Sequence, residues 1–111
     1  MENKIPILVS TKYGYGWSTT VFDNEIKRIM MTNVKLVDYV IKRKNSNRSP
    51  LAKDVRNIWL ENFPDITIPE LRGVHQLSVL WVTKGQPFQV KHFHGAEYIY
   101  FPSDDPNWFI A

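Results

Sequence analysis

Hydrophobic and polar positions follow two different periods in the two halves of this chain. From residue 23 to residue 62, apolar side chains recur every three to four positions, which is the period of an amphipathic helix. Beyond Pro69 the period shortens to two, which is typical of β-strands. A further alternating run, Ile5 to Val9, precedes the helical part. The pattern predicts an α+β fold with a first strand, two or three helices, and then an antiparallel β-meander packed against the helices.

The first two helices are predicted from their capping residues. Asp23 is a suitable N-cap for a short helix that ends near Met31. Thr32 or Asn33 can then cap a second helix, which runs to about Lys44. The apolar side chains expected to face the core are Ile26, Ile29, Met30, Leu36, Val37, Val40 and Ile41.

A third helix is predicted after a polar stretch. Ser49 can serve as its N-cap, with Pro50 at the first helical position, where the missing N–H of proline does no harm. The helix is expected to end near Asn62, just before Pro64. Its buried side chains are expected to be Leu51, Val55, Ile58 and Trp59.

The second half of the chain predicts three strands and a short C-terminal one. Leu77 to Val82 is largely apolar at both sets of alternate positions, which predicts a central strand of the sheet. Phe88 to His94 and Glu97 to Phe101 predict a hairpin closed by Gly95-Ala96 in a type II′ turn. Residues 108–111 are expected to add the last strand.

This predicted register sorts the hairpin side chains onto two faces. One face carries Phe88, Val90, Ile99 and Phe101 as core residues, with His92, His94 and Glu97 on the same side toward the tip. The other carries Gln89, Lys91, Phe93, Tyr98 and Tyr100. If exposed, this second face is a platform for stacked bases or for the side chains of a protein partner. The alternative is that helices cover it, because aromatic strands usually pack.

His92, His94 and Glu97 are candidate metal ligands, because two imidazoles and a carboxylate are a known set for zinc or iron. No further ligand stands nearby in the sequence. The simpler interpretation is a cross-strand pair of His94 and Glu97 at a solvated sheet end, worth about a few tenths of a kcal/mol. We therefore expect no metal and no cofactor.

The segment from Tyr13 to Thr20 places two glycines among three large aromatic residues. Glycine permits a positive φ or the close approach of a ligand, and the aromatic rings and hydroxyl groups offer stacking and hydrogen bonds. The candidate binding residues here are Tyr13, Tyr15, Trp17, Ser18 and Thr19. Between a strand and a helix, the loop from Gly14 to Thr20 is also suited to present its amides to a phosphate. The alternative is that the loop packs its aromatic side chains onto the core.

Composition narrows the class of protein. A length of 111 residues with 43% hydrophobic residues predicts a single domain over residues 1–111. The absence of cysteine excludes a disulfide framework and thiol catalysis. No stretch approaches the roughly 20 apolar residues of a membrane span, and no basic region followed by a long apolar segment opens the chain. We therefore expect a soluble, cytoplasmic protein with no membrane partner.

The net charge of +3 is unevenly distributed. Residues 23–62 contain nine Lys or Arg against five Asp or Glu, whereas residues 63–111 contain three against five. Lys42, Arg43 and Arg48 are the basic residues expected to attract a phosphate or an acidic partner. The alternative is that these lysines and arginines form an ordinary solvated face.

Four segments together resemble a group of small uncharacterised proteins encoded by tailed bacteriophages. They are Gly16-Trp17-Ser18-Thr19, Trp81 to Phe88, His94-Gly95-Ala96-Glu97 and Asn107 to Ala111, and they match in order and spacing. Where this chain has Phe93-His94-Gly95, those relatives often have Tyr-Asp-Gly, which argues against histidine as a metal ligand. Residues 32–62 carry little of the resemblance, which implies a source and a size class but no catalytic residues. Phage origin favours a host-takeover or counter-defence role, which usually operates by binding.

No catalytic constellation is visible in the sequence, so we expect a non-catalytic phage accessory protein in the host cytoplasm. Its partner is expected to be a host protein, bound through Tyr13, Tyr15, Trp17, Tyr98 and Tyr100 with help from Lys42, Arg43 and Arg48. The alternatives are a nucleic-acid-binding protein, a binder of a small nucleotide or phosphate at the loop from Gly14 to Thr20, and a minor virion component. An open edge at the C-terminal strand would also permit a homodimer.

Overall fold

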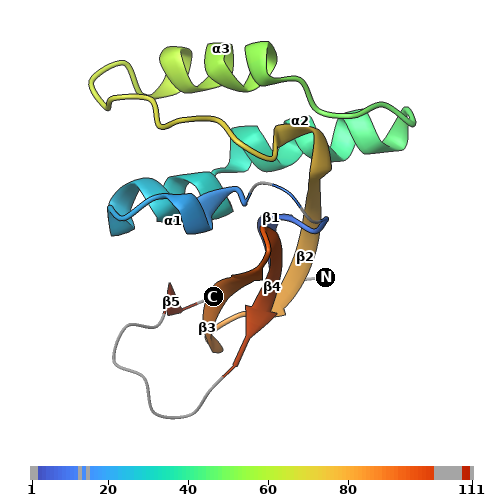
Figure 1. Ribbon diagram of the computed structural model, residues 1–111, viewed down its shortest axis with the longest axis vertical. Coiled ribbons are helices and arrows are strands. Elements are labelled where there is room, and N and C mark those ends of the chain that lie inside the picture. Colours follow the sequence, from blue (N-terminus) through green and yellow to red (C-terminus); the bar gives the residue numbers. More distant parts are fainter. Residues whose placement is uncertain (1–2, 13, 15, 102–108, 111) are drawn as a thin grey trace.

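The secondary structure follows the order that the hydrophobic periods predict, and the fold is α+β (Figure 1). The computed structural model describes residues 3–12, 14, 16–101 and 109–110. Two short 3₁₀ helices, η1 (Ser18–Thr20) and η2 (Val74–Gln76), accompany the larger elements. Those elements are β1 (Lys4–Ser10), α1 (Asn24–Thr32), α2 (Val34–Asn45), α3 (Ala52–Asn62), β2 (Leu77–Thr83), β3 (Pro87–Phe93), β4 (Ala96–Tyr100) and β5 (Phe109–Ile110).

A two-stranded ribbon of β1 and β2 forms the middle layer of the protein. The strands are antiparallel, with Lys4 opposite Thr83 and Ser10 opposite Leu77. One face of the ribbon, including Leu8 and Leu77, packs against helical residues, and the other, including Ile7, packs against the hairpin of β3 and β4. Apolar residues pack on both faces of β2, but the prediction of a central strand is wrong, because among the described strands β2 pairs with β1 alone.

The capping predictions for the first two helices are confirmed. The Asp23 carboxylate accepts a hydrogen bond from the Ile26 N–H at 3.0 Å, and the Asn33 side chain accepts one from the Leu36 N–H at 3.2 Å. Only Asn33 separates α1 from α2, so the chain bends there. Burial of the apolar stripe of α2 confirms the expected core face: Leu36, Val37 and Val40 are buried, and Ile41 is half-buried.

The predicted start of the third helix is wrong. The N-cap is Leu51, which makes no side-chain capping bond, and both Ser49 and Pro50 precede the helix. The Tyr39 hydroxyl on α2 takes the capping role, since it accepts a hydrogen bond from the Leu51 N–H at 2.9 Å. The same hydroxyl donates to the Asp54 carboxylate at 2.7 Å. A tertiary contact therefore sets this helix boundary, while the predicted end at Asn62 is confirmed.

The Tyr39 contact predicts a loss of stability in alkaline solution. Burial, and then the hydrogen bond to Asp54, raise the pKa of Tyr39 above its usual value of about 10. The folded state therefore holds this proton more tightly than the unfolded state, so its contribution is complete below about pH 10 and is lost as the pH rises through the raised pKa. Tyr39→Phe should cost about 1 kcal/mol at neutral pH, and this deficit should shrink above about pH 10. Urea denaturation of both proteins across this range measures the difference; a constant deficit would contradict the assignment.

The hairpin turn lies one residue earlier than predicted. The loop residues are His94 and Gly95, with φ angles of 50° and 84°, which is the left-handed pair that a type I′ turn requires. Histidine is among the residues that tolerate this region, and its carbonyl oxygen accepts a hydrogen bond from the Gly14 N–H at 2.9 Å. The predicted Gly95-Ala96 turn is therefore wrong.

The corrected pairing preserves the predicted faces of the hairpin. Glu97 pairs with His92 instead of His94, a shift of two positions, and alternate residues of a strand share a face. Val90 and Ile99 pack inward as expected, whereas Phe101, expected in the core, is 49% exposed. The core prediction for Phe101 is wrong because the residue lies just beyond the end of β4.

The C-terminal strand β5 pairs with the start of β3, with Ile110 opposite Pro87. The sheet order is β4-β3-β5. Trp108 and Ala111, the outer residues of the predicted strand, lie outside the described residues. Among the helices that the structure describes, none has both the length and the apolar character needed to cross a membrane.

Candidate functional site

A buried carboxylate, that of Glu97, joins the hairpin to the loop that follows β1. The residue is 3% exposed, and its Oε1 accepts a hydrogen bond from the Ser10 N–H at 2.9 Å. Its Oε2 accepts three more: from the Trp17 N–H at 2.8 Å, from the Thr19 N–H at 2.9 Å and from the Thr19 hydroxyl at 2.6 Å. Hydrogen bonds to a charged acceptor are stronger than neutral ones, so Glu97 is the anchor of this loop.

The anchor corrects the idea that the glycine loop offers its amides to a phosphate. The amides of Trp17 and Thr19 already point at an anion, and this anion is the chain's own carboxylate. Gly16 has no room for a side chain, because an added Cβ would collide with the Thr19 hydroxyl and lie 3.1 Å from Glu97 Oε2. Gly16 therefore allows the loop to close on Glu97, and these two amides are not free for a ligand.

Trp17 belongs to the core. Its side chain is fully buried, and its indole N–H donates to the Met30 carbonyl oxygen at 2.8 Å. The prediction that Trp17 is a contact residue is wrong, because a partner cannot reach it, and the alternative that the loop tucks an aromatic side chain inward is confirmed for this residue. Tyr13 and Tyr15, the other aromatic candidates of the loop, lie outside the described residues.

The metal-ligand hypothesis for His92, His94 and Glu97 is not supported. The oxygens of Glu97 accept four hydrogen bonds, and no three His, Asp or Glu side chains of the described part form a group suited to a metal ion. The His92 ring instead accepts a 3.4 Å hydrogen bond from the Gly95 N–H. The predicted pair of His94 and Glu97 is also wrong, since the His94 ring lies against Phe93 with centroids 4.4 Å apart.

The outer face of the hairpin carries an exposed group of residues that we call the aromatic platform: Lys91, Phe93, Tyr98 and Tyr100. Phe93 is 61% exposed, Tyr98 44% and Tyr100 40%. The Lys91 ammonium lies 4.0 Å from the centroid of the Tyr100 ring, within the range of a cation–π contact. The alternative that helices cover this face is wrong, because Phe93, Tyr98 and Tyr100 are all exposed.

The surface around the platform has no exposed negative charge within β2, β3 and β4. From Leu77 to Phe101 the only acidic residue is Glu97, which is buried. Four residues of this segment that carry or can acquire a positive charge are exposed, namely Lys84, Lys91, His92 and His94. Within β2 to β4, the exposed residues that can carry a charge are therefore all of one sign, which favours an anionic partner.

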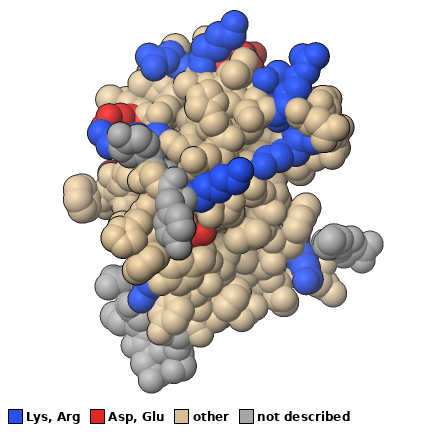
Figure 2. Space-filling model, turned by 45° about the vertical axis from the view of Figure 1, so that its right-hand side comes forward, with Lys and Arg blue, Asp and Glu red and all other residues tan. Residues whose placement is uncertain are grey.

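The predicted basic contacts lie elsewhere. Lys42 and Arg43 belong to the last turns of α2, and Arg48 follows that helix. Arg43 Nε also donates to the Ser49 carbonyl oxygen at 2.9 Å. Figure 2 shows Lys and Arg side chains gathered over the helical half of the face in view. The helical layer and the platform are on opposite sides of the ribbon, so Lys42, Arg43 and Arg48 do not share one surface with Tyr98 and Tyr100.

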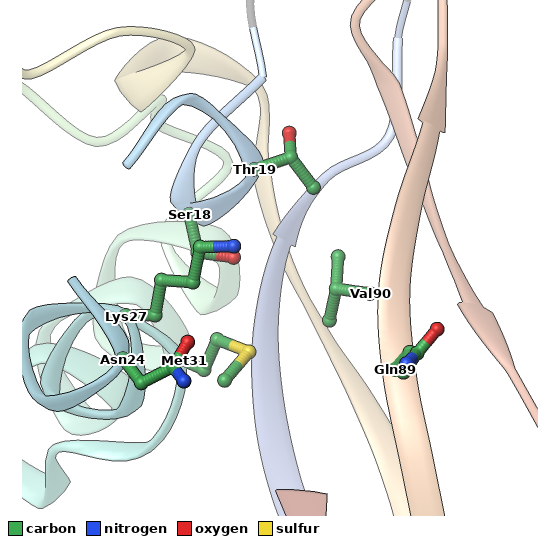
Figure 3. Close-up of a pocket in the computed structure, with 7 residues that line it drawn as sticks. All are labelled: Ser18, Thr19, Asn24, Lys27, Met31, Gln89 and Val90. Atoms are coloured by element: carbon green, nitrogen blue, oxygen red, sulfur yellow. The ribbon is translucent and has the colours of Figure 1, made fainter. Parts of the chain in front are cut away.

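A cleft of about 260 Å³ opens between α1, η1 and β3 (Figure 3). Sequence reasoning missed it, because nothing in the pattern shows that α1 lies beside β3. Ser18 and Thr19 were candidates for the glycine loop, and Gln89 was assigned to the platform face. The residues that line the cleft are Ser18, Thr19, Asn24, Lys27, Met31, Gln89 and Val90.

Comparison of the chain with protein-family models, curated proteins and solved structures found no match. A functional proposal for this protein therefore depends on the geometry and charge of the aromatic platform and the adjoining cleft.

Proposed function

We propose that this protein is a non-catalytic binder of single-stranded nucleic acid, whose bases stack on the aromatic platform. The observation that carries the proposal is the exposure of Phe93, Tyr98 and Tyr100 on one sheet face, beside Lys91 and with no exposed acid in β2 to β4. Aromatic side chains on a positively charged surface are the usual elements of single-strand recognition.

The spacing of the platform suits successive bases. Tyr98 and Tyr100 are two positions apart on β4, and so about 7 Å apart along the strand. An extended single strand can place neighbouring bases on two such rings. Lys91 lies directly opposite Tyr98 in the pairing and its ammonium lies 4.0 Å from the centroid of the Tyr100 ring, which places its charge near the phosphates that would join those bases.

Charge and shape favour this partner over a protein or a duplex. A protein surface presents charges of both signs, whereas strands β2 to β4 expose no acidic residue and match a polyanion better. Bases in a duplex are stacked on each other and are not free to stack on tyrosine. The resemblance to small tailed-bacteriophage proteins supplies a setting for the proposal: an accessory protein that binds exposed single strands in the host cytoplasm.

The test is the affinity of the protein for a labelled oligothymidine of roughly 16 nucleotides, measured by fluorescence anisotropy at low salt. Tyr98→Ala and Tyr100→Ala should each weaken binding about tenfold, since stacking is worth about 1–3 kcal/mol per base. Tyr98→Phe should retain most of the affinity, because it keeps the ring. Phe22→Ala is the matched control: Phe22 is 98% exposed but lies before α1, so its loss should leave the affinity unchanged.

Three outcomes would overturn the proposal. The first is no binding at low salt, where phosphate contacts are strongest. The second is equal affinity for a duplex of the same length. The third is the capture of a protein from nuclease-treated lysate, provided that this capture is lost in Tyr98→Ala and Tyr100→Ala. That result would support the hypothesis that the platform binds a protein.

A further inference from the structure

The cleft beside β3 contains a buried hydroxyl that has no partner among the described residues. Ser18 is 1% exposed and lines the cleft, yet its hydroxyl makes no hydrogen bond within the part of the chain that the structure describes. No fully occluded side-chain oxygen in that part lacks a partner, so the small exposed area of this hydroxyl faces the cleft. The neighbouring Thr19 hydroxyl differs, since it donates to Glu97.

The helical wall of the cleft is positively charged. Lys27 on α1 is half-buried and forms no ion pair with any described residue. Asn24 lies one helical turn earlier on the same wall, directly after the N-cap Asp23. Figure 3 shows Lys27 and Asn24 on the helical side, with Val90 and Gln89 across from them on β3. None of the described residues that line the cleft is acidic.

The cleft adjoins the aromatic platform through one residue. Gln89 lines the cleft, and in the hairpin it lies directly opposite Tyr100. A nucleic-acid strand that passes from the Tyr100 ring across β3 at Gln89 therefore reaches the mouth of the cleft. At about 260 Å³ the cleft is below the roughly 300–1,000 Å³ of sites for drug-sized ligands, so it suits a phosphate with part of its sugar better than a whole nucleotide.

We infer that this cleft binds one phosphate group of the strand that stacks on the aromatic platform. Lys27 provides the charge, and the Ser18 hydroxyl and the Asn24 amide donate hydrogen bonds to the phosphate oxygens. The inference rests on the proposed function and extends the contact surface from the hairpin to α1. The platform orders the bases, and the cleft fixes the position of the backbone.

The test is the salt dependence of oligothymidine binding by Lys27→Gln. Loss of one phosphate contact should reduce the slope of log K against log salt by about 0.7 and weaken binding several-fold at low salt. Lys53→Gln is the matched control. Lys53 is an exposed lysine on α3, so this substitution removes the same charge away from the cleft and should leave the slope unchanged. Ser18→Ala should weaken binding at fixed salt and leave the slope unchanged, because it removes no charge.

A second measurement separates a strand phosphate from a free one. An oligothymidine with a neutral methylphosphonate at the contacted linkage should bind the original protein and Lys27→Gln equally well. If Tyr98→Ala weakens binding but Lys27→Gln changes neither affinity nor slope, the cleft inference is wrong and the proposed function stands. Inorganic phosphate could instead bind at Ser18 in NMR titrations while Lys27→Gln leaves the affinity for oligothymidine unchanged. The cleft would then be a site for free anions, and the inference would equally be wrong. Absence of any oligonucleotide binding would overturn both proposals.

Discussion

Replacement of Glu97 by glutamine is expected to destabilise the fold by about 3 kcal/mol. The buried carboxylate accepts four hydrogen bonds, one at Oε1 and three at Oε2. An amide can offer an oxygen at only one of these places, so its NH₂ group must face at least one N–H that now lacks an acceptor. Thermal unfolding should move down by about 12 °C or more for a chain of this size. Circular dichroism melts measure this shift directly.

Glu61→Gln is the matched control for charge. Glu61 is exposed on α3, and the same chemical change there should alter stability by less than about 0.5 kcal/mol. Similar melting temperatures for Glu97→Gln and the original protein would mean that the four hydrogen bonds are not what holds the loop.

Gly16→Ala is expected to cost about 2–3 kcal/mol, a large effect for the addition of one methyl group. The new Cβ would collide with the Thr19 hydroxyl and crowd Glu97 Oε2 at 3.1 Å. Thr19 must then move, and its amide and hydroxyl both lose their alignment with the carboxylate. The melting temperature and the urea midpoint of the variant report this loss.

A double-mutant cycle tests the cause of the Gly16 effect. Thr19→Ala alone should cost about 1.5 kcal/mol for the lost hydrogen bond to a charged acceptor. It also removes the atom that the new methyl group would meet. The double variant Gly16→Ala/Thr19→Ala should therefore lose less stability than the sum of the two single variants. Strict additivity would show that the strain arises elsewhere in the loop.

Local signals in the sequence were sufficient for most of the fold. Asp23 and Asn33 cap their helices because the bond that each makes lies within three residues of itself. The apolar positions of β2 predicted a central strand, but β2 pairs with β1 alone among the described strands, and its apolar side chains instead pack into clusters on both faces of this ribbon. The prediction of Ser49 as the N-cap of α3 was wrong, because the hydroxyl oxygen of Tyr39 accepts the hydrogen bond from the Leu51 N–H, twelve residues later in the chain. A contact between two helices of this kind cannot be predicted from the hydrophobic pattern of either helix.

Some residues of the candidate site could be predicted from local patterns in the sequence, and others could not. The alternation of side chains along β3 and β4 correctly placed Tyr98 and Tyr100 on one face, although the predicted turn was wrong. The correct pairing differs from the predicted one by two positions, and alternate residues of a strand share a face. The prediction of Trp17 as a contact residue was wrong, since an aromatic residue in a glycine loop is equally compatible with the core, where it lies, and with the surface. Lys27 was missed because the cleft requires α1 and β3 to be neighbours, and residues 33–86 separate these two elements in the chain.

The Glu97 anchor also has a consequence for the order of events during synthesis. The backbone N–H groups of Trp17 and Thr19 donate to the Glu97 carboxylate, which lies 80 and 78 residues later in the chain. Until the hairpin has left the ribosome, the first strand is followed by a loop whose amides have no acceptor. Contacts of such long sequence separation slow folding, because the intervening chain must be ordered before they form. A nascent chain halted before Glu97 should therefore hold its helices without a settled N-terminal loop.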